Sequence, residues 1–88
     1  MKKIIYKGNK NIIGKALREN RIKRGLTQEE LAAKMQTLEV NLDQQMISKI
    51  EANARFVTDY ELMFFCKALE VDIKDMLAAF CENEKMNK

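Results

Sequence analysis

One stretch in the middle of the chain constrains its fold most, because it predicts two helices that lie close together, each with its own capping signal. Thr27 is followed three residues later by Glu30, which is the spacing of a capping box: the hydroxyl and the carboxylate each accept a hydrogen bond from a backbone N–H at the start of a helix. Asp43 has a side chain that can cap a second helix. We therefore expect helices over about residues 28–38 and 44–52.

The second of these helices divides into an inward side and a polar side at about 100° of rotation per residue. The inward side holds Met46, Ile47, Ile50 and Glu51, and the polar side holds Gln44, Gln45, Ser48, Lys49 and Ala52. A face of amides, a hydroxyl, a lysine and a methyl group suits the major groove of DNA, because Gln pairs bidentately with adenine and Lys donates to guanine acceptors. We predict that this helix reads base edges.

The surrounding sequence resembles the phage-repressor-like (Cro/cI, Xre-type) helix-turn-helix family. Three motifs carry the resemblance from about Ile12 to Leu77 at nearly the family's spacing: LR..R...GLTQEELA, ISKIE and KALEV. The resemblance implies an all-α fold, a compact five-helix lambda-repressor-like domain of residues 12–81. A basic N-terminal segment of residues 1–11, either an arm or a short strand, would precede this domain, and a polar tail of residues 82–88 would follow it.

Two features depart from the family pattern. The connection Gln36–Leu42 is longer than the short Gly-containing turn that usually precedes the recognition helix, and it contains neither Gly nor Pro. We expect Val40 and Leu42 to pin this connection to the core. Ala52-Asn53 stands where the family usually has Asn-Gly, and Asn tolerates the left-handed conformation that Gly would otherwise supply.

The shared polar side of the second helix predicts that Gln44, Gln45, Ser48 and Lys49 read bases. The candidates for holding phosphates are Thr27, Gln28, Asn53 and Arg55, and the resemblance implies this role for Gln28. At Gln28 the backbone N–H and the helix dipole would add to phosphate binding. Without the motif, Gln28 is simply a solvent-exposed glutamine in a helix cap. For Arg55 the alternative is an ordinary surface arginine.

A first helix is predicted over about residues 12–24, with Asn11 as its N-cap and Gly25 as its left-handed stop. Arg21 lies on its inward-facing line, where an isolated charge is costly. Glu51 lies at the edge of the inward arc of the recognition helix, has the opposite charge, and occupies a position that relatives often pair with that of Arg21. We expect a structural ion pair that fixes the two helices without touching bases. The alternative is two unrelated surface charges.

The C-terminal third predicts two more helices and a dimer surface. One helix begins at a second capping box, Thr58 to Glu61, and the other begins at Asp72. One side of the first holds Leu62, Phe65, Cys66 and Leu69, and one side of the second holds Ile73, Met76, Leu77 and Phe80. The candidates for contacts between two copies are Tyr60, Met63 and Phe64, which face outward, and Ile73 and Asp75, which match the region where relatives meet. Residues 4–6 could instead cover the outward-facing side chains.

The net charge of +3 hides an uneven distribution: residues 1–25 hold nine Lys and Arg against one acid, whereas residues 26–88 hold seven against twelve. The basic N-terminal quarter suits a polyanion such as DNA, although a solvated tail and a lysine-rich helix face would give the same counts. No apolar run approaches the roughly 20 residues of a membrane span, and the N-terminus lacks the apolar region of a signal peptide. We expect a cytoplasmic, nucleoid-associated protein of bacterial or phage origin, with no membrane partner.

The composition also argues against an enzyme or a metalloprotein. The chain has no histidine and two cysteines, Cys66 within a helical pattern and Cys81 near the end. Cys66 is most simply a small core residue. No pair of cysteines has metal-ligand spacing, and no nucleophile stands beside a base. We expect no catalytic residues, no metal and no cofactor.

These observations favour a sequence-specific regulator, a repressor of phage or prophage type, that binds a double-stranded DNA operator as a homodimer. An antitoxin that represses its own operon would share these features and would add a protein partner, a toxin or another regulator. A helical protein-interaction module that has lost DNA binding would explain the outward apolar residues. It would not explain why the polar face of the recognition helix carries no acid.

Overall fold

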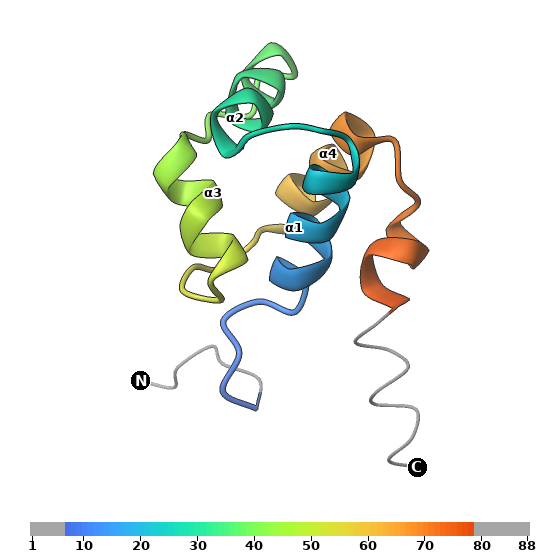
Figure 1. The fold of residues 1–88 in the computed structure, drawn as a ribbon. Coiled ribbons are helices and arrows are strands. Elements are labelled where there is room, and N and C mark those ends of the chain that lie inside the picture. Colours follow the sequence, from blue (N-terminus) through green and yellow to red (C-terminus); the bar gives the residue numbers. More distant parts are fainter. Residues whose placement is uncertain (1–6, 79–88) are drawn as a thin grey trace.

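Four α-helices and a further helical segment pack around one apolar core in the computed structural model, which describes residues 7–78 (Figure 1). The helices are α1 (Gly14–Lys23), α2 (Gln28–Thr37), α3 (Gln44–Glu51) and α4 (Asp59–Leu69), and the further segment covers residues 73–78. Both α1 and α2 pack against α3 and against α4. The described part of the chain therefore has the all-α architecture expected from the sequence.

The core is filled by side chains from every helix and from the connection between α2 and α3. The largest fully buried ones are Leu17, Leu31, Met35, Leu42, Ile47, Ile50, Phe65, Leu69 and Met76. Burying a side chain of this size stabilises the fold by about 1.5–3 kcal/mol relative to leaving it exposed. Cys66 lies in the same core, as predicted, and burial raises the pKa of its thiol.

The helix starts follow their predicted caps. Thr27 and Glu30 form the predicted capping box: the Thr27 hydroxyl accepts the Glu30 N–H at 3.0 Å, and the Glu30 carboxylate accepts the Thr27 N–H at 2.8 Å. Thr58 and Glu61 make the same reciprocal pair at the start of α4. The Asp43 side chain caps α3 by accepting a backbone N–H from its first turn.

The first helix begins later than predicted, at Gly14. Its N-cap position is Ile13, yet Asn11 still supplies the capping group, because its Oδ1 accepts the N–H of Gly14 at 2.8 Å. Glycine is required at this position, since a Cβ would collide with the carbonyl oxygen of Ile50 in α3. Gly25, with φ +71°, ends the helix in the left-handed conformation that was predicted for it.

The connection between α2 and α3 turns without glycine. Glu39 adopts the left-handed conformation, with φ 64°, and the N–H of Val40 bonds back to the carbonyl of Met35 at 3.0 Å. The Gln36 side chain donates to the carbonyl of Leu42 at 3.3 Å. Val40 and Leu42 are buried, as predicted. The connection is therefore held by its own hydrogen bonds as well as by the core.

Three side-chain placements differ from the helical periodicity. Met46, predicted to face inward, is 36% exposed. It lies at the flank of α3, whose buried residues are Ile47 and Ile50. Phe64, predicted to face outward, is half-buried, since its ring reaches the core from the flank of α4. Ile73 shares a predicted side with the buried Met76 but is exposed, because it lies at the beginning of its segment, beyond the edge of the core. The predictions for residues 4–6, Phe80, Cys81 and the polar tail lie outside the described residues.

Candidate nucleic-acid interface

The helix α3 lies at one side of the bundle (Figure 1). It presents a polar face to solvent. The predicted base-reading residues lie on this face: Gln44, Gln45 and Lys49 are exposed and Ser48 is half-buried. On the opposite side Ile47 and Ile50 are fully buried. The one acid of α3, Glu51, turns its side chain into the domain. The exposed face of α3 therefore offers amides, a hydroxyl and an ammonium group without a carboxylate.

The carboxylate of Glu51 is held by Arg21 of α1 in a two-pronged ion pair. Arg21 Nε donates to Glu51 Oε2 at 2.7 Å and Nη2 donates to Oε1 at 3.0 Å, and the two side chains are 10% and 4% exposed. Arg21 also donates to the carbonyl of Leu26 at 2.7 Å. The hydrogen bond with Glu51 raises the pKa of Arg21 above its ordinary value, although burial acts in the opposite direction. The pair joins α1 to α3 behind the exposed face.

Two glutamine amides extend this ion pair to the surface. Gln28 Nε2 donates to Glu51 Oε1 at 2.9 Å, and Gln44 Nε2 donates to Gln28 Oε1 at 2.7 Å. We call this chain of hydrogen bonds from Arg21 to Gln44 the amide relay. An amide has two N–H donors and a carbonyl oxygen with two lone pairs. Gln44 therefore keeps one N–H and its carbonyl oxygen, which are the two groups that bidentate pairing with adenine needs.

The first turn of α2 lies beside the amide relay. Thr27, Gln28, Glu29 and Gln44 line an open hollow there. The free N–H groups at the start of a helix carry a partial positive charge that attracts phosphates. The Thr27 hydroxyl is already engaged in its capping box, so the half-buried Gln28 amide is the side chain that remains for a phosphate. The roles predicted for Thr27 and Gln28 stay predictions.

Arg55 and Asn53, the other predicted phosphate contacts, are bonded to partners within the chain. Arg55 forms a two-pronged ion pair with Glu61 of α4, at 3.0 and 3.2 Å. Burial raises the pKa of Glu61, but the hydrogen bonds from Arg55 and from the Thr58 N–H outweigh it, so this pKa lies below its ordinary value. Asn53 has a left-handed φ of 60°, as expected for a residue in place of Gly, and its side chain bonds to residues 9–11. The sequence predicts neither set of partners, because Arg55 and Asn53 lie in a loop without periodicity.

The predicted dimer residues of α4 differ in exposure. Tyr60 and Met63 are exposed, whereas Phe64 is half-buried against the core. Phe56, in the loop before α4, is also exposed. Sequence reasoning missed Phe56 because helical periodicity gives no signal in a loop. The large apolar side chains that are exposed in this region are therefore Phe56, Tyr60 and Met63.

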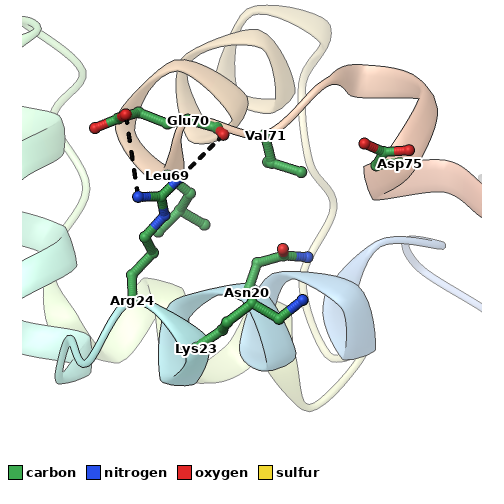
Figure 2. A pocket seen from close by; sticks show the side chains of 7 residues that line it. All are labelled: Asn20, Lys23, Arg24, Leu69, Glu70, Val71 and Asp75. Atoms are coloured by element: carbon green, nitrogen blue, oxygen red, sulfur yellow. Dashed lines mark hydrogen bonds and ion pairs between the residues drawn. The ribbon is translucent and has the colours of Figure 1, made fainter.

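Ile73 and Asp75, the other two dimer candidates, are both exposed. Asp75 lines a hollow between the end of α1 and the end of α4 (Figure 2). Beside this hollow Arg24 donates to the backbone carbonyl of Glu70 at 3.2 Å and lies 4.0 Å from its carboxylate (Figure 2). Such exposed pairs contribute little to stability. The hollow carries both charges, with Lys23 and Arg24 facing Glu70 and Asp75, so it favours neither an anion nor a cation.

Within residues 7–78, no three His, Cys, Asp or Glu side chains gather as a metal site would require. The helices of this part of the chain are too short or too polar to cross a membrane. Comparison with known proteins gave one family: a model described as helix-turn-helix matches residues 17–76, which is more than half of the chain. Searches of curated proteins and of solved structures found no match.

The family match covers α2, the connection, α3 and the part of α1 that holds Arg21, and these parts carry the amide relay and the exposed polar face. It also covers the ISKIE motif and the KALEV motif at their predicted places. The chain therefore belongs to the phage-repressor-like, Xre-type helix-turn-helix family and is a DNA-binding helix-turn-helix regulator.

Proposed function

We propose that this regulator is a repressor that recognises one operator sequence in double-stranded DNA as a homodimer, with α3 in the major groove. The exposed face of α3 carries the proposal, because Gln44, Gln45 and Lys49 are exposed together and no acid of α3 accompanies them. These side chains supply the donors and acceptors with which proteins distinguish base pairs in the major groove.

Within this face Gln44 is the residue best prepared to read a base. Its amide is held by Gln28, while one N–H and the carbonyl oxygen stay available for adenine. Gln28 is held in turn by Glu51. A side chain that is already oriented loses less conformational freedom on binding than a mobile one. The amide relay therefore supports a specific rather than a merely electrostatic contact.

Phosphate contacts would supply sequence-independent affinity and fix the register of α3 on the duplex. Gln28 keeps a second N–H for a phosphate, with the dipole of α2 behind it. Arginine has five N–H donors, and the bonds of Arg55 to Glu61 and to the Phe56 carbonyl occupy three of them. Thr27 would contribute through its position at the start of α2.

A dimer is proposed because one recognition helix covers only a few base pairs. Two such helices bound one helical turn apart reach successive major grooves, about 34 Å from centre to centre. The exposed surface of Phe56, Tyr60 and Met63 could join two copies, with Ile73 and Asp75 as further candidates.

The experiment that tests the proposal is selection of binding sites from randomised duplex DNA, followed by affinity measurements on the selected duplex and on an unrelated one. We expect one enriched site with two-fold symmetry. Gln45→Ala and Lys49→Ala should each weaken binding to the selected duplex by about 1–3 kcal/mol. Lys67→Ala, which alters an exposed lysine of α4, serves as the control and should bind as the wild type does. No enriched sequence, or α3 variants that bind like the wild type, would contradict the proposal.

The exposed apolar residues of α4 favour one alternative, an antitoxin-type autorepressor that holds a toxin or another regulator on this surface. Such a protein would bind the same operator, but the bound partner would change its operator affinity. A helical interaction module without DNA binding would instead show no salt-dependent affinity for duplex DNA, because it would release no counterions.

A further inference from the structure

Residues 9–11 are held against the end of α3 by an asparagine cluster, which consists of Asn9, Asn11 and Asn53. Asn53 lies in the loop that follows α3, and its Oδ1 accepts the N–H of Lys10 at 2.8 Å and the N–H of Asn11 at 3.1 Å. Asn53 Nδ2 donates to Asn9 Oδ1 at 2.6 Å. Residues far apart in the sequence are thus joined by one side chain, which fixes the backbone of Lys10.

Asn11 ties the same segment to two helices. Its Nδ2 donates to the carbonyl of Ile50 in the last turn of α3 at 3.0 Å and to the carbonyl of Arg55 at 2.9 Å. Its Oδ1 accepts the N–H groups of Ile13 and Gly14 at 3.1 and 2.8 Å. Both donors and both lone pairs of this amide are therefore used. The start of α1, the end of α3 and the loop to α4 meet at Asn11.

Basic side chains gather at this end of α3. Lys10 and Lys15 are exposed, and Lys15 lines a hollow together with Asn53. Lys49 is exposed on α3 itself, about one helical turn before Asn53. Glu51 lines the same hollow, but its charge is balanced by the buried ion pair with α1. The net charge of this surface is therefore positive, which is complementary to the phosphates of DNA.

We propose that residues 9–11 form a fixed strap of the DNA interface, in which Lys10 contacts a phosphate beyond the end of α3 and Asn53 positions it. This inference rests on the proposed function and adds a contact to it. An asparagine suits position 53 for two reasons. It adopts the left-handed conformation more readily than most residues, and its amide makes hydrogen bonds that a glycine could not make. Because Asn53 already fixes the backbone of Lys10, binding has to order only the lysine side chain.

The test uses the whole chain, the selected duplex and an unrelated duplex, and measures how steeply affinity falls with salt concentration. The proteins are the wild type, Lys10→Ala, Asn53→Gly and the double variant. Glycine keeps the left-handed backbone without strain, so Asn53→Gly removes only the side-chain bonds. We expect Lys10→Ala to reduce the salt slope by about one unit on both duplexes. Asn53→Gly should reduce it by a similar amount although it removes no charge, and the double variant should add nothing.

Two further variants sharpen the result. Lys67→Ala removes one positive charge from α4 and is the charge control. It should reduce the salt slope by only a small fraction of the reduction seen for Lys10→Ala. Asn9→Ala removes the hydrogen bond that Asn53 donates to the strap and leaves the sequence of the loop after α3 unchanged, so it separates loss of the strap from a general loosening of the domain. It should change the slope in the same direction as Asn53→Gly while the thermal melt stays at the wild-type temperature.

A wild-type slope for Lys10→Ala would overturn the phosphate contact. Losses that add in the double variant, or a wild-type slope for both Asn53→Gly and Asn9→Ala, would overturn the positioning role of Asn53. If the wild type bound neither duplex, the proposed function would fall together with the strap. If the wild type bound both duplexes and the Lys10→Ala slope matched it, the strap alone would fall.

Discussion

Two ion pairs lie beside α3 and beside the loop that follows it. They differ in how deeply their side chains are buried and in which hydrogen bonds continue from them. Arg21–Glu51 joins α1 to α3, with side chains 10% and 4% exposed, whereas Arg55–Glu61 joins the following loop to α4, with side chains 29% and 6% exposed. The first pair continues through the amide relay to the exposed face of α3. The second pair is bonded to the capping box at the start of α4, because the Glu61 carboxylate also accepts the Thr58 N–H. Loss of the first pair should therefore alter the exposed face of α3, and loss of the second should affect mainly the start of α4.

The largest expected effect comes from breaking the deeper pair. Arg21→Met leaves the Glu51 carboxylate buried without its cation, which should lower the free energy of unfolding by roughly 3–5 kcal/mol. Replacing both residues, by Arg21→Met with Glu51→Leu, should cost much less, because no unpaired charge is left behind. Chemical denaturation of the two single variants and the double variant measures the coupling. A double-mutant cycle without coupling energy would contradict the structural role of this pair.

Breaking the shallower pair should have a smaller effect. Arg55→Met should lower the free energy of unfolding by about 1–3 kcal/mol, since the Glu61 carboxylate keeps the hydrogen bond from the Thr58 N–H and solvent reaches part of the site. On DNA the same variant should weaken binding to selected and unrelated duplexes alike, because phosphates are read without regard to sequence. A loss confined to the selected duplex would assign Arg55 to a base instead.

The shallower pair also predicts a dependence on pH. The pKa of Glu61 in the folded protein lies below its ordinary value of 4.5. A carboxylate of this kind contributes stability above its unfolded-state pKa, and that contribution is lost as the pH falls through the folded-state pKa. The free energy of unfolding should therefore drop in the acidic range below that ordinary value. Glu61→Gln should show a shallower drop than the wild type over the same range, and a parallel curve would contradict the assignment.

Breaking the amide relay should have a small effect on the free energy of unfolding and a large effect on the selectivity between DNA sequences. Gln28→Ala removes neutral hydrogen bonds and should cost about 1 kcal/mol in the free energy of unfolding. It should also free the Gln44 amide, so that the preference for the selected duplex over one with a single changed base pair becomes smaller. Competition binding between the two duplexes measures that preference. An undiminished preference would show that Gln44 needs no support from Gln28.

The smallest effect on stability is expected at the exposed surface of α4. Met63→Glu should change the free energy of unfolding by no more than about 0.5 kcal/mol, as is usual for surface positions. Sedimentation should nevertheless show that the folded variant is a monomer. Its affinity for the operator should be weaker than that of the wild type. Phe64→Glu is the contrasting variant, because Phe64 is half-buried and its loss should destabilise the domain. A Met63→Glu protein that still dimerises would remove Met63 from the interface.

The two ion pairs also show what could be predicted from the sequence. Arg21 and Glu51 lie on helices whose apolar periodicity reveals which side faces inward, so their pairing was predictable. The starts of α2, α3 and α4 were predictable because a cap is a local signal. Arg55 was not assigned to Glu61, since a loop residue has no periodicity and its partner is set by tertiary packing.

The remaining differences have the same origin. The asparagine cluster joins residues 9–11 to the loop after α3, and no local pattern marks such a contact. Met46 and Phe64 lie at the flanks of their helices, where a rotation of a few tens of degrees decides between core and solvent. The requirement for glycine at position 14 comes from the approach of α1 to the carbonyl of Ile50, and no local pattern marks that approach either.

The central claim is that the exposed face of α3 reads base pairs, with Gln44 on an adenine. The most direct test measures the affinity of the wild type and of Gln44→Ala on the selected duplex and on duplexes in which each base pair is changed in turn. The wild type should lose about 1–3 kcal/mol at each contacted position. Gln44→Ala should become indifferent at one A·T position in each half-site and keep the wild-type losses everywhere else. A Gln44→Ala protein that discriminates at every position as the wild type does would contradict the claim.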